Sequence, residues 1–473
     1  MQKIVISLMF LMLIPSMVLA SDVIQSTDND QSQVEVTVYN SNMGLIKDVR
    51  SLKLPVATGE LRFMDVAASI IPETVHVKSL NHPNDLSILE QNYEYDLMNE
   101  QKLLDKYVGK TLKIQNWNPY QDKKDIVDAK LLSNNNGPIY EINNEIYLGY
   151  TGTKILPSLP ENLIAKPTLM WMYENTAKDA HQLEVSYLTN NITWKADYIV
   201  VLNQDDTSGN LSGWVTIDNK SGAAYKDASL KLVAGEVNRV EQQNDLEFGL
   251  MKRSGVRLEA KTSQFEEQGF FEYHIYDLQR KTTIKDNQTK QINLLEANNA
   301  KVQKELLTYG QSYYFTGLYR DQDMKQPVNV YVKFKNSKEN NLGMPLPAGI
   351  MRLYKEDKDK KLQFIGEDSI KHTPKDEEVK LKIGEAFDVV VERKQTDYKV
   401  ISNRVFETEW EVKLRNHKDQ DVTVGVVEPL IGDWDVVQES QPHVKVDAFT
   451  VRFDVNVPKN KEVVLKYRIR VTY

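Results

Sequence analysis

Apolar and polar residues alternate along much of this chain, which favours β-sheets with one buried face and one face in water. The clearest run lies near the C-terminal end, where Phe406, Thr408, Trp410, Val412 and Leu414 face one way. The residues between them face the other way: Glu407, Glu409, Glu411, Lys413 and Arg415. Comparable alternation fills 182–217, 449–457 and 465–471, and short turns rich in Asn, Asp or Gly separate the runs. The sequence therefore predicts a mainly β fold made of antiparallel β-sandwich domains.

The N-terminal part has a weaker and more varied pattern. Residues 21–180 are predicted to form a smaller β-rich domain, with a barrel-like set of short strands from Thr111 to Tyr173. One short helix is expected ahead of this set, capped by Asp96 and left at Gly109.

Two sandwiches are predicted to follow, the first over 181–340 and the second over 341–473, with the boundary near Asn341. Periodicity is lost over 241–270, which is rich in Gln and Glu, so a long mobile loop is expected there.

The first residues carry the signature of an export signal. Lys3 precedes an apolar run from Ile4 to Leu19, and Ala20 provides a small residue for signal peptidase. We expect residues 1–20 to be a signal peptide and the mature chain to begin at Ser21. The alternative, a transmembrane anchor, fits poorly because the run is short and Pro15 interrupts it. No later stretch is apolar enough to span a bilayer, so the predicted location is the periplasm or the cell surface.

Composition narrows the function further. The chain has no cysteine, which excludes disulfides, thiolate metal sites and cysteine nucleophiles. The formal charge is −8, and about −9 once Lys3 is removed, with acidic and basic residues interspersed. Nucleic acid is therefore not an expected partner.

No motif for a metal or cofactor is apparent. The seven histidines lack the spacings of chelating pairs, and no phosphate loop, dinucleotide fingerprint or nucleophile elbow occurs. No metal, cofactor or catalytic residue is therefore predicted. Glu367 and His372, in a polar segment, are weak candidates for an acid–base pair, although a solvated connection between strands explains the segment more simply.

Two tryptophans in loop-like sequence are weak candidates for binding. Trp117 lies in an Asn-rich stretch before Pro119, and Trp434 lies between Asp433 and Asp435. Exposed aromatic rings stack on sugars or anchor a protein partner, but they more often cover a domain edge.

Several motifs in order resemble a known family. They are Thr193–Tyr198, Leu232–Gly235, Glu272–Tyr276, Leu342–Gly349, Phe364–Asp368, His372–Pro374 and Gly384–Asp388. Over about 182–473 the chain is similar to the bacterial domain-of-unknown-function family DUF4139, and more distantly to mucoidy inhibitor A proteins, which carry a coiled coil that this chain lacks. The resemblance implies a β-rich, exported protein without an established activity, and it assigns no catalytic residues.

Three function classes stay open on the sequence. The leading hypothesis is a non-catalytic envelope protein that binds or scaffolds a protein or polysaccharide partner. The second is an envelope glycan hydrolase that uses carboxylates such as Glu367. The third is an outer-membrane β-barrel, suggested by the alternating strand that ends at Tyr473.

Overall fold

The computed structural model describes residues 23–94, 98–118, 120, 122–159, 166–235, 237–238, 264–319 and 324–472. The predicted signal peptide and residues 241–263 of the predicted loop lie outside these residues. Residues 265–270, which were expected to belong to that loop, form strand β17 instead. The mainly β fold predicted from the alternation is confirmed, because the described strands form six sheets and α1 (Glu100–Tyr107) is the α-helix among the described elements.

Two sheets make up the N-terminal body. The smaller has the order β1 (Val23–Ser26), β4 (Ala57–Met64), β12 (Thr168–Asn175) and β6 (Leu86–Glu94). The larger has the order β17 (Phe265–Phe270), β18 (Tyr273–Leu278), β16 (Tyr225–Ala234), β2 (Gln31–Tyr39), β3 (Met43–Leu52), β13 (His181–Asn190) and β5 (His76–Ser79), with β19 (Thr282–Ile284) beside β16. The 3-10 turns η1 (Asp28–Asp30) and η2 (Pro72–Thr74) connect strands of this body.

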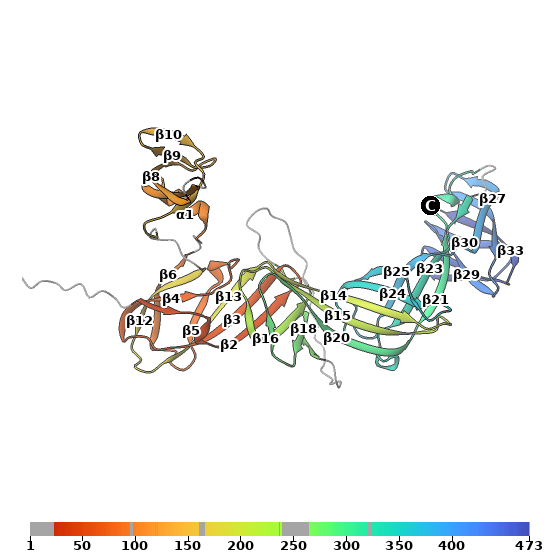
Figure 1. Cartoon of the computed structure of the whole chain (residues 1–473). Coiled ribbons are helices and arrows are strands. Elements are labelled where there is room, and N and C mark those ends of the chain that lie inside the picture. Colours follow the sequence, from red (N-terminus) through yellow and green to blue (C-terminus); the bar gives the residue numbers. More distant parts are fainter. Residues whose placement is uncertain are drawn as a thin grey trace, which may run out of the picture.

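A third sheet continues the body, with the order β20 (Gln288–Lys301), β15 (Ser208–Asn219), β14 (Ile192–Leu202), β24 (Gly349–Glu356) and β25 (Leu362–Ile370). One apolar core runs through all three sheets, and Figure 1 shows them in a row. β14 and β24 pair in parallel, as do β1 with β4, β16 with β2, and β21 with β29. The other pairings are antiparallel, as predicted.

The C-terminal end is a sandwich of two further sheets. One has the order β26 (Glu378–Glu385), β23 (Asn329–Lys335), β21 (Gln303–Tyr309), β29 (Val422–Pro429), β32 (Thr450–Val457) and β31 (His443–Asp447). The other has the order β22 (Met324–Gln326), β27 (Val389–Ser402), β28 (Val405–Asn416), β33 (Lys461–Thr472) and β30 (Asp433–Glu439). Short turns η3 (Ser312–Phe315) and η4 (Lys338–Asn340) lie between strands of this region.

The alternation in β28 places side chains as the sequence indicated. Trp410, Val412 and Leu414 are fully buried in the sandwich core, where the rings of Phe453 and Tyr467 stack at 4.8 Å. The charged residues between them form a ladder of ion pairs on the outer face, such as Arg470 with Glu407 and Lys466 with Glu411.

The predicted boundaries near 180 and 341 differ from the strand pairing. β13 pairs with β3, so strands on both sides of residue 180 share a sheet. β24 follows residue 341 yet pairs with β14, and β25 pairs with β24 in the same sheet. Phe334 and Met351 belong to one core. Both β13 with β3 and β24 with β14 are pairings between strands far apart in sequence, and such pairings leave no local signal in the alternation.

An inserted domain stands off one end of the body (Figure 1). It comprises α1 and a sheet with the order β10 (Glu145–Leu148), β9 (Ile139–Ile142), β8 (Lys123–Ser133), β7 (Thr111–Asn118) and β11 (Thr153–Ile155). Its core is separate and includes Leu104, Ile114, Leu131 and Tyr140. Asn99 caps α1 through a 2.9 Å bond from the Lys102 amide, in place of the predicted Asp96, which lies outside the described residues.

Candidate functional site

Of the predicted pair, Glu367 lies on β25 with an exposed side chain, and His372 lies two residues after the end of that strand. Arg352 Nε lies 3.1 Å from Glu367 Oε2, and Arg352 also contacts Asp197 at 3.1 Å. His372 Nδ1 accepts a 3.2 Å bond from the Ala348 amide, and its Nε2 lies 3.4 Å from Asn40 Nδ2. These contacts tie Glu367 to an ion pair across the sheet and His372 to the connection before β24.

The two candidate tryptophans have different surroundings. Trp117 lies on β7 with 59% of its surface exposed, opposite Lys124 on β8. Trp434 is half-buried on β30, its indole N–H donates to the Ala448 carbonyl at 2.8 Å, and Lys445 lies 4.7 Å from its ring centre. Trp434 therefore covers the edge of the C-terminal sandwich, whereas Trp117 presents its ring to solvent.

A buried ion pair on β3 was not anticipated from the sequence. Asp48 and Arg50 point inward and are 4% and 0% exposed. Arg50 donates to Asp48 Oδ2 through Nε at 3.2 Å and Nη2 at 2.9 Å, and its guanidinium lies 3.5 Å from the ring centre of Phe63. The sequence did contain a signal for the inward direction of these two side chains. Ile46, Asp48, Arg50 and Leu52 share one strand face, and the outer two are apolar.

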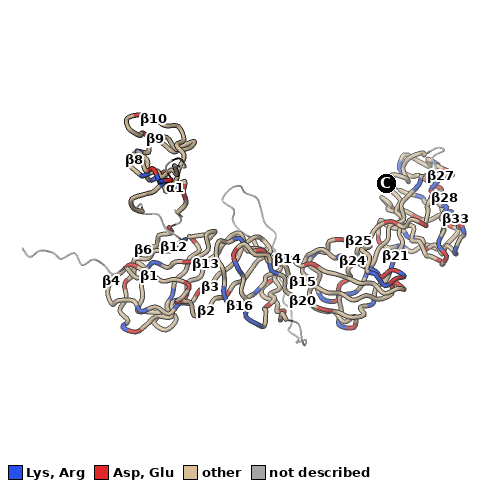
Figure 2. The backbone as a smooth tube through the Cα atoms, viewed as in Figure 1, with Lys and Arg blue, Asp and Glu red and all other residues tan. Residues whose placement is uncertain are grey.

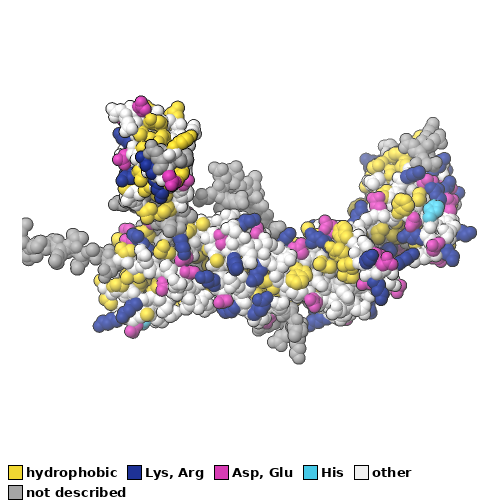
Figure 3. Space-filling model, viewed as in Figure 1, with side chains coloured by type: hydrophobic (Ala, Val, Ile, Leu, Met, Phe, Trp, Pro, Cys, Tyr) yellow, Lys and Arg dark blue, Asp and Glu magenta, His cyan; other side chains and the backbone are white. Residues whose placement is uncertain are grey.

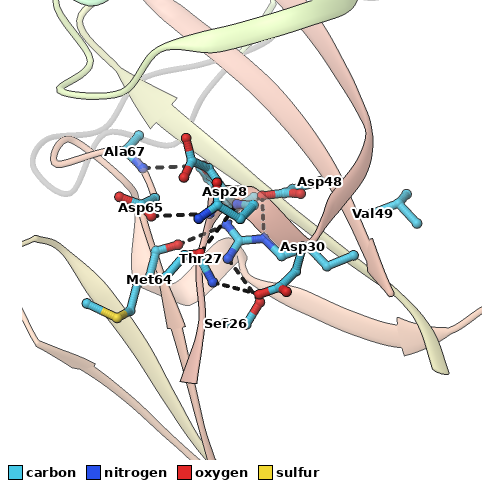
Figure 4. A network of polar contacts seen from close by, with 12 residues as sticks. Ser26, Thr27, Asp28, Asp30, Asp48, Val49, Met64, Asp65 and Ala67 are labelled. Carbon is cyan, nitrogen blue, oxygen red and sulfur yellow. Dashed lines mark hydrogen bonds and ion pairs between the residues drawn. The ribbon is translucent and has the colours of Figure 1, made fainter. Parts of the chain in front are cut away.

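The surroundings of Arg50 fix its position (Figure 4). Nη1 donates to Ser26 Oγ on β1 at 3.2 Å, and Nη2 donates to the Met64 carbonyl on β4 at 2.8 Å. The guanidinium thus joins the two sheets of the N-terminal body. Arg50 Nε and Nη2 both donate to Asp48 Oδ2. Asp48 Oδ1 is buried without a hydrogen-bond partner in the described part of the chain.

A cavity of about 270 Å³ opens beside this pair. Its residues come from six places in the sequence that the fold brings together: Asp28, Gln31 and Val34; Ile46, Asp48 and Arg50; Asp65 and Val66; Lys166 and Pro167; Tyr187; and Gly222–Tyr225. Lys166 pairs with Asp65, and Lys226 Nζ lies 2.8 Å from Asp28 Oδ2. Figure 4 shows Asp28 and Asp65 side by side, where the Asp28 amide donates to Asp65 Oδ2 at 3.2 Å.

The electrostatics of the cavity suit binding by hydrogen bonds. The bond from Lys226 lowers the pKa of Asp28, so this carboxylate is charged at neutral pH. Burial raises the pKa of Tyr187 and of Tyr225, so both hydroxyls keep their protons. Tyr225 bonds to Ser221 at 2.9 Å, while the Tyr187 hydroxyl accepts from the Ala67 amide at 3.3 Å. In the described segments, no group of three or more His, Cys, Asp or Glu is arranged to hold a metal ion.

A second buried charge network lies in the C-terminal sandwich. Arg393 and Glu428 are both fully buried, and Nη2 lies 2.6 Å from Oε1. The Tyr467 hydroxyl accepts from Arg393 Nη1 at 2.5 Å and donates to Glu428 Oε1 at 2.8 Å. Burial raises the pKa of Glu428 although Arg393 lies beside it. Arg393 on β27 and Tyr467 on β33 belong to one sheet and Glu428 on β29 to the other, so the arrangement cross-links the two sheets of the sandwich.

The inserted domain exposes several apolar side chains. Figure 3 shows hydrophobic groups on its visible face. On edge strand β10, Ile146 is 69% and Leu148 is 81% exposed, and on β8 Ile126 is 54% exposed. In the described sheet order β10 pairs with β9 alone, so its other edge keeps unpaired backbone groups.

Comparison with known proteins identifies a family. The sequence model of the family described as "Domain of unknown function (DUF4139)" matches residues 183–473. This range covers the strands from β13 to the C-terminal end. The inserted domain and most of the Arg50 cavity precede it. No curated protein matches the chain.

Proposed function

We propose that this chain, which belongs to the family described as "Domain of unknown function (DUF4139)", is an exported cell-envelope protein that acts as a non-catalytic binding or scaffolding module. The leader at 1–20 supports export. Figure 2 shows acidic and basic residues mixed along the described chain, a pattern that gives no strong field of one sign for nucleic acid. None of the helices in the described residues has the length and apolar character that a membrane crossing needs.

The observation that carries the proposal is the exposed edge of β10. Sheet edges in proteins are usually protected by charged residues, by proline or by a covering element, because unpaired backbone groups attract other strands. The sequence of β10 is Glu-Ile-Tyr-Leu, and Ile146 and Leu148 flank its free edge with little cover. An extended segment of a protein partner can pair with this edge and place apolar side chains against both residues.

The chemistry of this surface favours a protein over a polysaccharide. The most exposed groups of β10 itself are the aliphatic Ile146 and Leu148, which contribute through burial of apolar area. Sugars bind chiefly through hydrogen bonds and aromatic stacking. On β10 the aromatic residue is Tyr147, whose hydroxyl already donates to Glu145 at 3.0 Å and whose ring packs against Tyr150.

The test compares capture of envelope proteins by the mature chain and by two double variants. Ile146→Lys with Leu148→Lys places two charges on the β10 edge, and Val400→Lys with Ile401→Lys places two charges at comparably exposed positions of β27. We expect the β10 variant to lose a captured protein that the native chain and the β27 variant retain. Equal capture by all three forms would contradict the assignment, and binding only to glycans on an array would indicate a polysaccharide instead.

A separate assay addresses the non-catalytic part of the proposal. Purified mature chain is incubated with envelope glycan fragments, and products are separated by mass. We expect no turnover by the native chain above that of a Glu367→Gln variant. Turnover that this substitution abolishes would establish the hydrolase alternative. Export is tested by N-terminal sequencing of the secreted form, which should begin at Ser21.

A further inference from the structure

The sheet of the inserted domain presents an indole ring on the face away from its core. Leu112 and Ile114 of β7 are buried in that core. Trp117 follows Ile114 by three positions, an odd number, so its side chain points to the opposite face. The helix α1 lies on the core side, because its Leu104 and Tyr107 belong to the same core. The outer face is therefore left uncovered by the helix, and Trp117 is 59% exposed there.

The Trp117 side chain is not engaged by its neighbours. Among the described residues it makes no hydrogen bond, ring contact or cation contact. Trp434 differs, because its indole N–H donates to the Ala448 carbonyl and Lys445 lies 4.7 Å from its ring centre. Tyr120, in the turn that follows β7, is 97% exposed and adds a second aromatic ring at the same end of the sheet. A ligand can therefore cover aromatic surface at this end.

Polar side chains lie beside the Trp117 ring on the outer face. Lys124 of β8 lies directly opposite Trp117, and both are exposed. Gln115, two residues earlier on β7, lies between Ile126 of β8 and Thr153 of β11. Directly opposite residues have β-carbons about 4.5–5.5 Å apart, so these side chains reach a ligand that lies on the ring. The amide and the hydroxyl both donate and accept hydrogen bonds, and the ammonium group donates three.

This combination matches the two sides of a sugar. The C–H groups on one face of a pyranose ring pack against an aromatic face, and the hydroxyls around its rim donate and accept hydrogen bonds. The exposed residues of β10, Ile146 and Leu148, are aliphatic and offer no such stacking surface. Strands β9 and β8 separate β10 from β7, which places the two surfaces about 14 Å apart at the usual strand spacing. They are therefore separate surfaces of one domain.

The shape of the outer face favours a polymer over a single sugar. Neither described cavity includes a residue of the inserted domain. Sites for small ligands are concave and bury most of the ligand, so an open face suits a chain whose successive units each add a contact. Lys124 has no ion-pair partner in the described segments, whereas the neighbouring Lys123 lies 3.7 Å from Asp125. Lys124 is thus available to a carboxylate of an acidic polymer.

We infer that the outer face of the inserted domain is a polysaccharide-binding site in which Trp117 is the stacking platform. Gln115, Lys124 and Thr153 bond to the hydroxyl groups of the bound units. The site goes beyond the proposed protein contact at β10 and does not depend on it. A neutral and an acidic polysaccharide share the stacking chemistry, and the Lys124 side chain distinguishes them.

The experiment is affinity electrophoresis of the mature full chain in gels that contain dextran, hydroxyethyl cellulose or polygalacturonate, with sedimentation on purified peptidoglycan sacculi alongside. We expect at least one polymer to bind. Trp117→Leu keeps apolar bulk without the flat ring and should weaken binding roughly tenfold or more, whereas Trp117→Phe keeps a ring and should weaken it less. Loss of affinity in Lys124→Gln would identify an acidic polymer as the ligand, and native affinity a neutral one.

Two control variants should bind the polymer as the native chain does. Phe387→Leu changes an aromatic residue that is 95% exposed after β26. Ile146→Lys with Leu148→Lys changes the β10 edge, and it should lose the captured envelope protein while it keeps the polysaccharide. This contrast separates a failure of the polysaccharide site from a failure of the proposed protein contact. Circular dichroism and thermal unfolding identify which variants are folded.

Three results would overturn the inference: no binding to any of the four polymers, native affinity in a folded Trp117→Leu variant, or an equal loss of affinity in Phe387→Leu. Loss of the captured protein in Trp117→Leu, without binding of any polymer by the native chain, would assign the outer face to a protein instead.

Discussion

Gly310 and the buried carboxylate of Glu428 fit together only because residue 310 has no side chain. A β-carbon placed on Gly310 would lie far inside van der Waals contact distance of Glu428 Oε2, and the Glu428 side chain is fully buried. Its other oxygen is held by Tyr467 at 2.8 Å and by Arg393 at 2.6 Å. The network that joins the two C-terminal sheets therefore depends on a glycine outside it.

Substituting Gly310→Ala should reduce the free energy of unfolding of the C-terminal sandwich by about 1–3 kcal/mol, the usual cost of overpacking a core. Gly384→Ala is the matched control, since Gly384 is exposed and its added β-carbon would meet nothing within 4 Å. Urea denaturation followed by circular dichroism measures both. Equal urea midpoints for the two variants would contradict this prediction and would show that the Glu428 side chain can move aside.

Replacing one partner of the buried ion pair should lower the free energy of unfolding more than replacing both partners. Glu428→Leu leaves the Arg393 guanidinium buried without its counter-charge, with an expected loss of about 3–5 kcal/mol. The double variant Arg393→Met, Glu428→Leu removes both charges and should recover much of that loss. A double variant less stable than the single one in urea would mean that the pair contributes net stability.

The stability of the N-terminal body should fall on mild acidification because of His181. This side chain is fully buried, and burial, with a smaller contribution from His82, lowers its pKa; Asp85 acts in the opposite direction. Its ring bonds Ser79 at 2.9 Å and Asn175 at 3.0 Å. The unfolded chain therefore takes up a proton near pH 6.5 more readily than the folded chain, so stability is fully present above that pH and is lost below it.

Melting temperatures between pH 7.5 and pH 5 check this prediction. The native chain should lose stability over this interval, whereas His181→Gln, which keeps hydrogen-bonding groups without the titration, should lose less. His76→Gln, at an exposed histidine, should follow the native chain. Parallel curves for all three forms would rule out His181 as the source.

Removing the inserted domain should leave the body folded. Its core is separate from the core of the body, and Glu94 on β6 lies opposite Thr168 on β12, so the strands on either side of the insertion are already neighbours. A chain in which Gly-Ser replaces residues 99–159 should melt cooperatively near the native temperature. Loss of the cooperative transition would show that the insertion stabilises the body.

The alternation in the sequence predicted the strands well, but it did not predict the partners of the buried charged residues. Residues such as Trp410, Val412 and Leu414 could be assigned to a buried face because a two-residue period is a local property. Asp48 and Arg393 obey the same period, and their inward direction was therefore readable from Ile46 and Val391 beside them. Their partners were not, because Ser26, Met64 and Glu428 come from other strands that only pairing brings near.

The candidates chosen from the sequence were selected for being polar or aromatic in loop-like stretches. Glu367 and Trp434 instead lie on β25 and β30, where Glu367 pairs with Arg352 and the Trp434 indole N–H donates to the Ala448 carbonyl. Trp117 keeps an exposed ring, and its role as a binding residue stays a prediction. The exposed edge of β10 had no signal in the sequence, since the order of strands decides which edge is left unpaired.

Site-specific photo-crosslinking in the cell tests the central claim, that the β10 edge takes up a segment of a partner protein. A photoreactive residue is placed at position 148, or at position 400 of β27 as the control, in the full chain with its leader. The account predicts a discrete crosslinked species from position 148 that position 400 does not give, and its loss when Ile146→Lys is added. No adduct at 148, or the same adduct from both positions, would contradict the account.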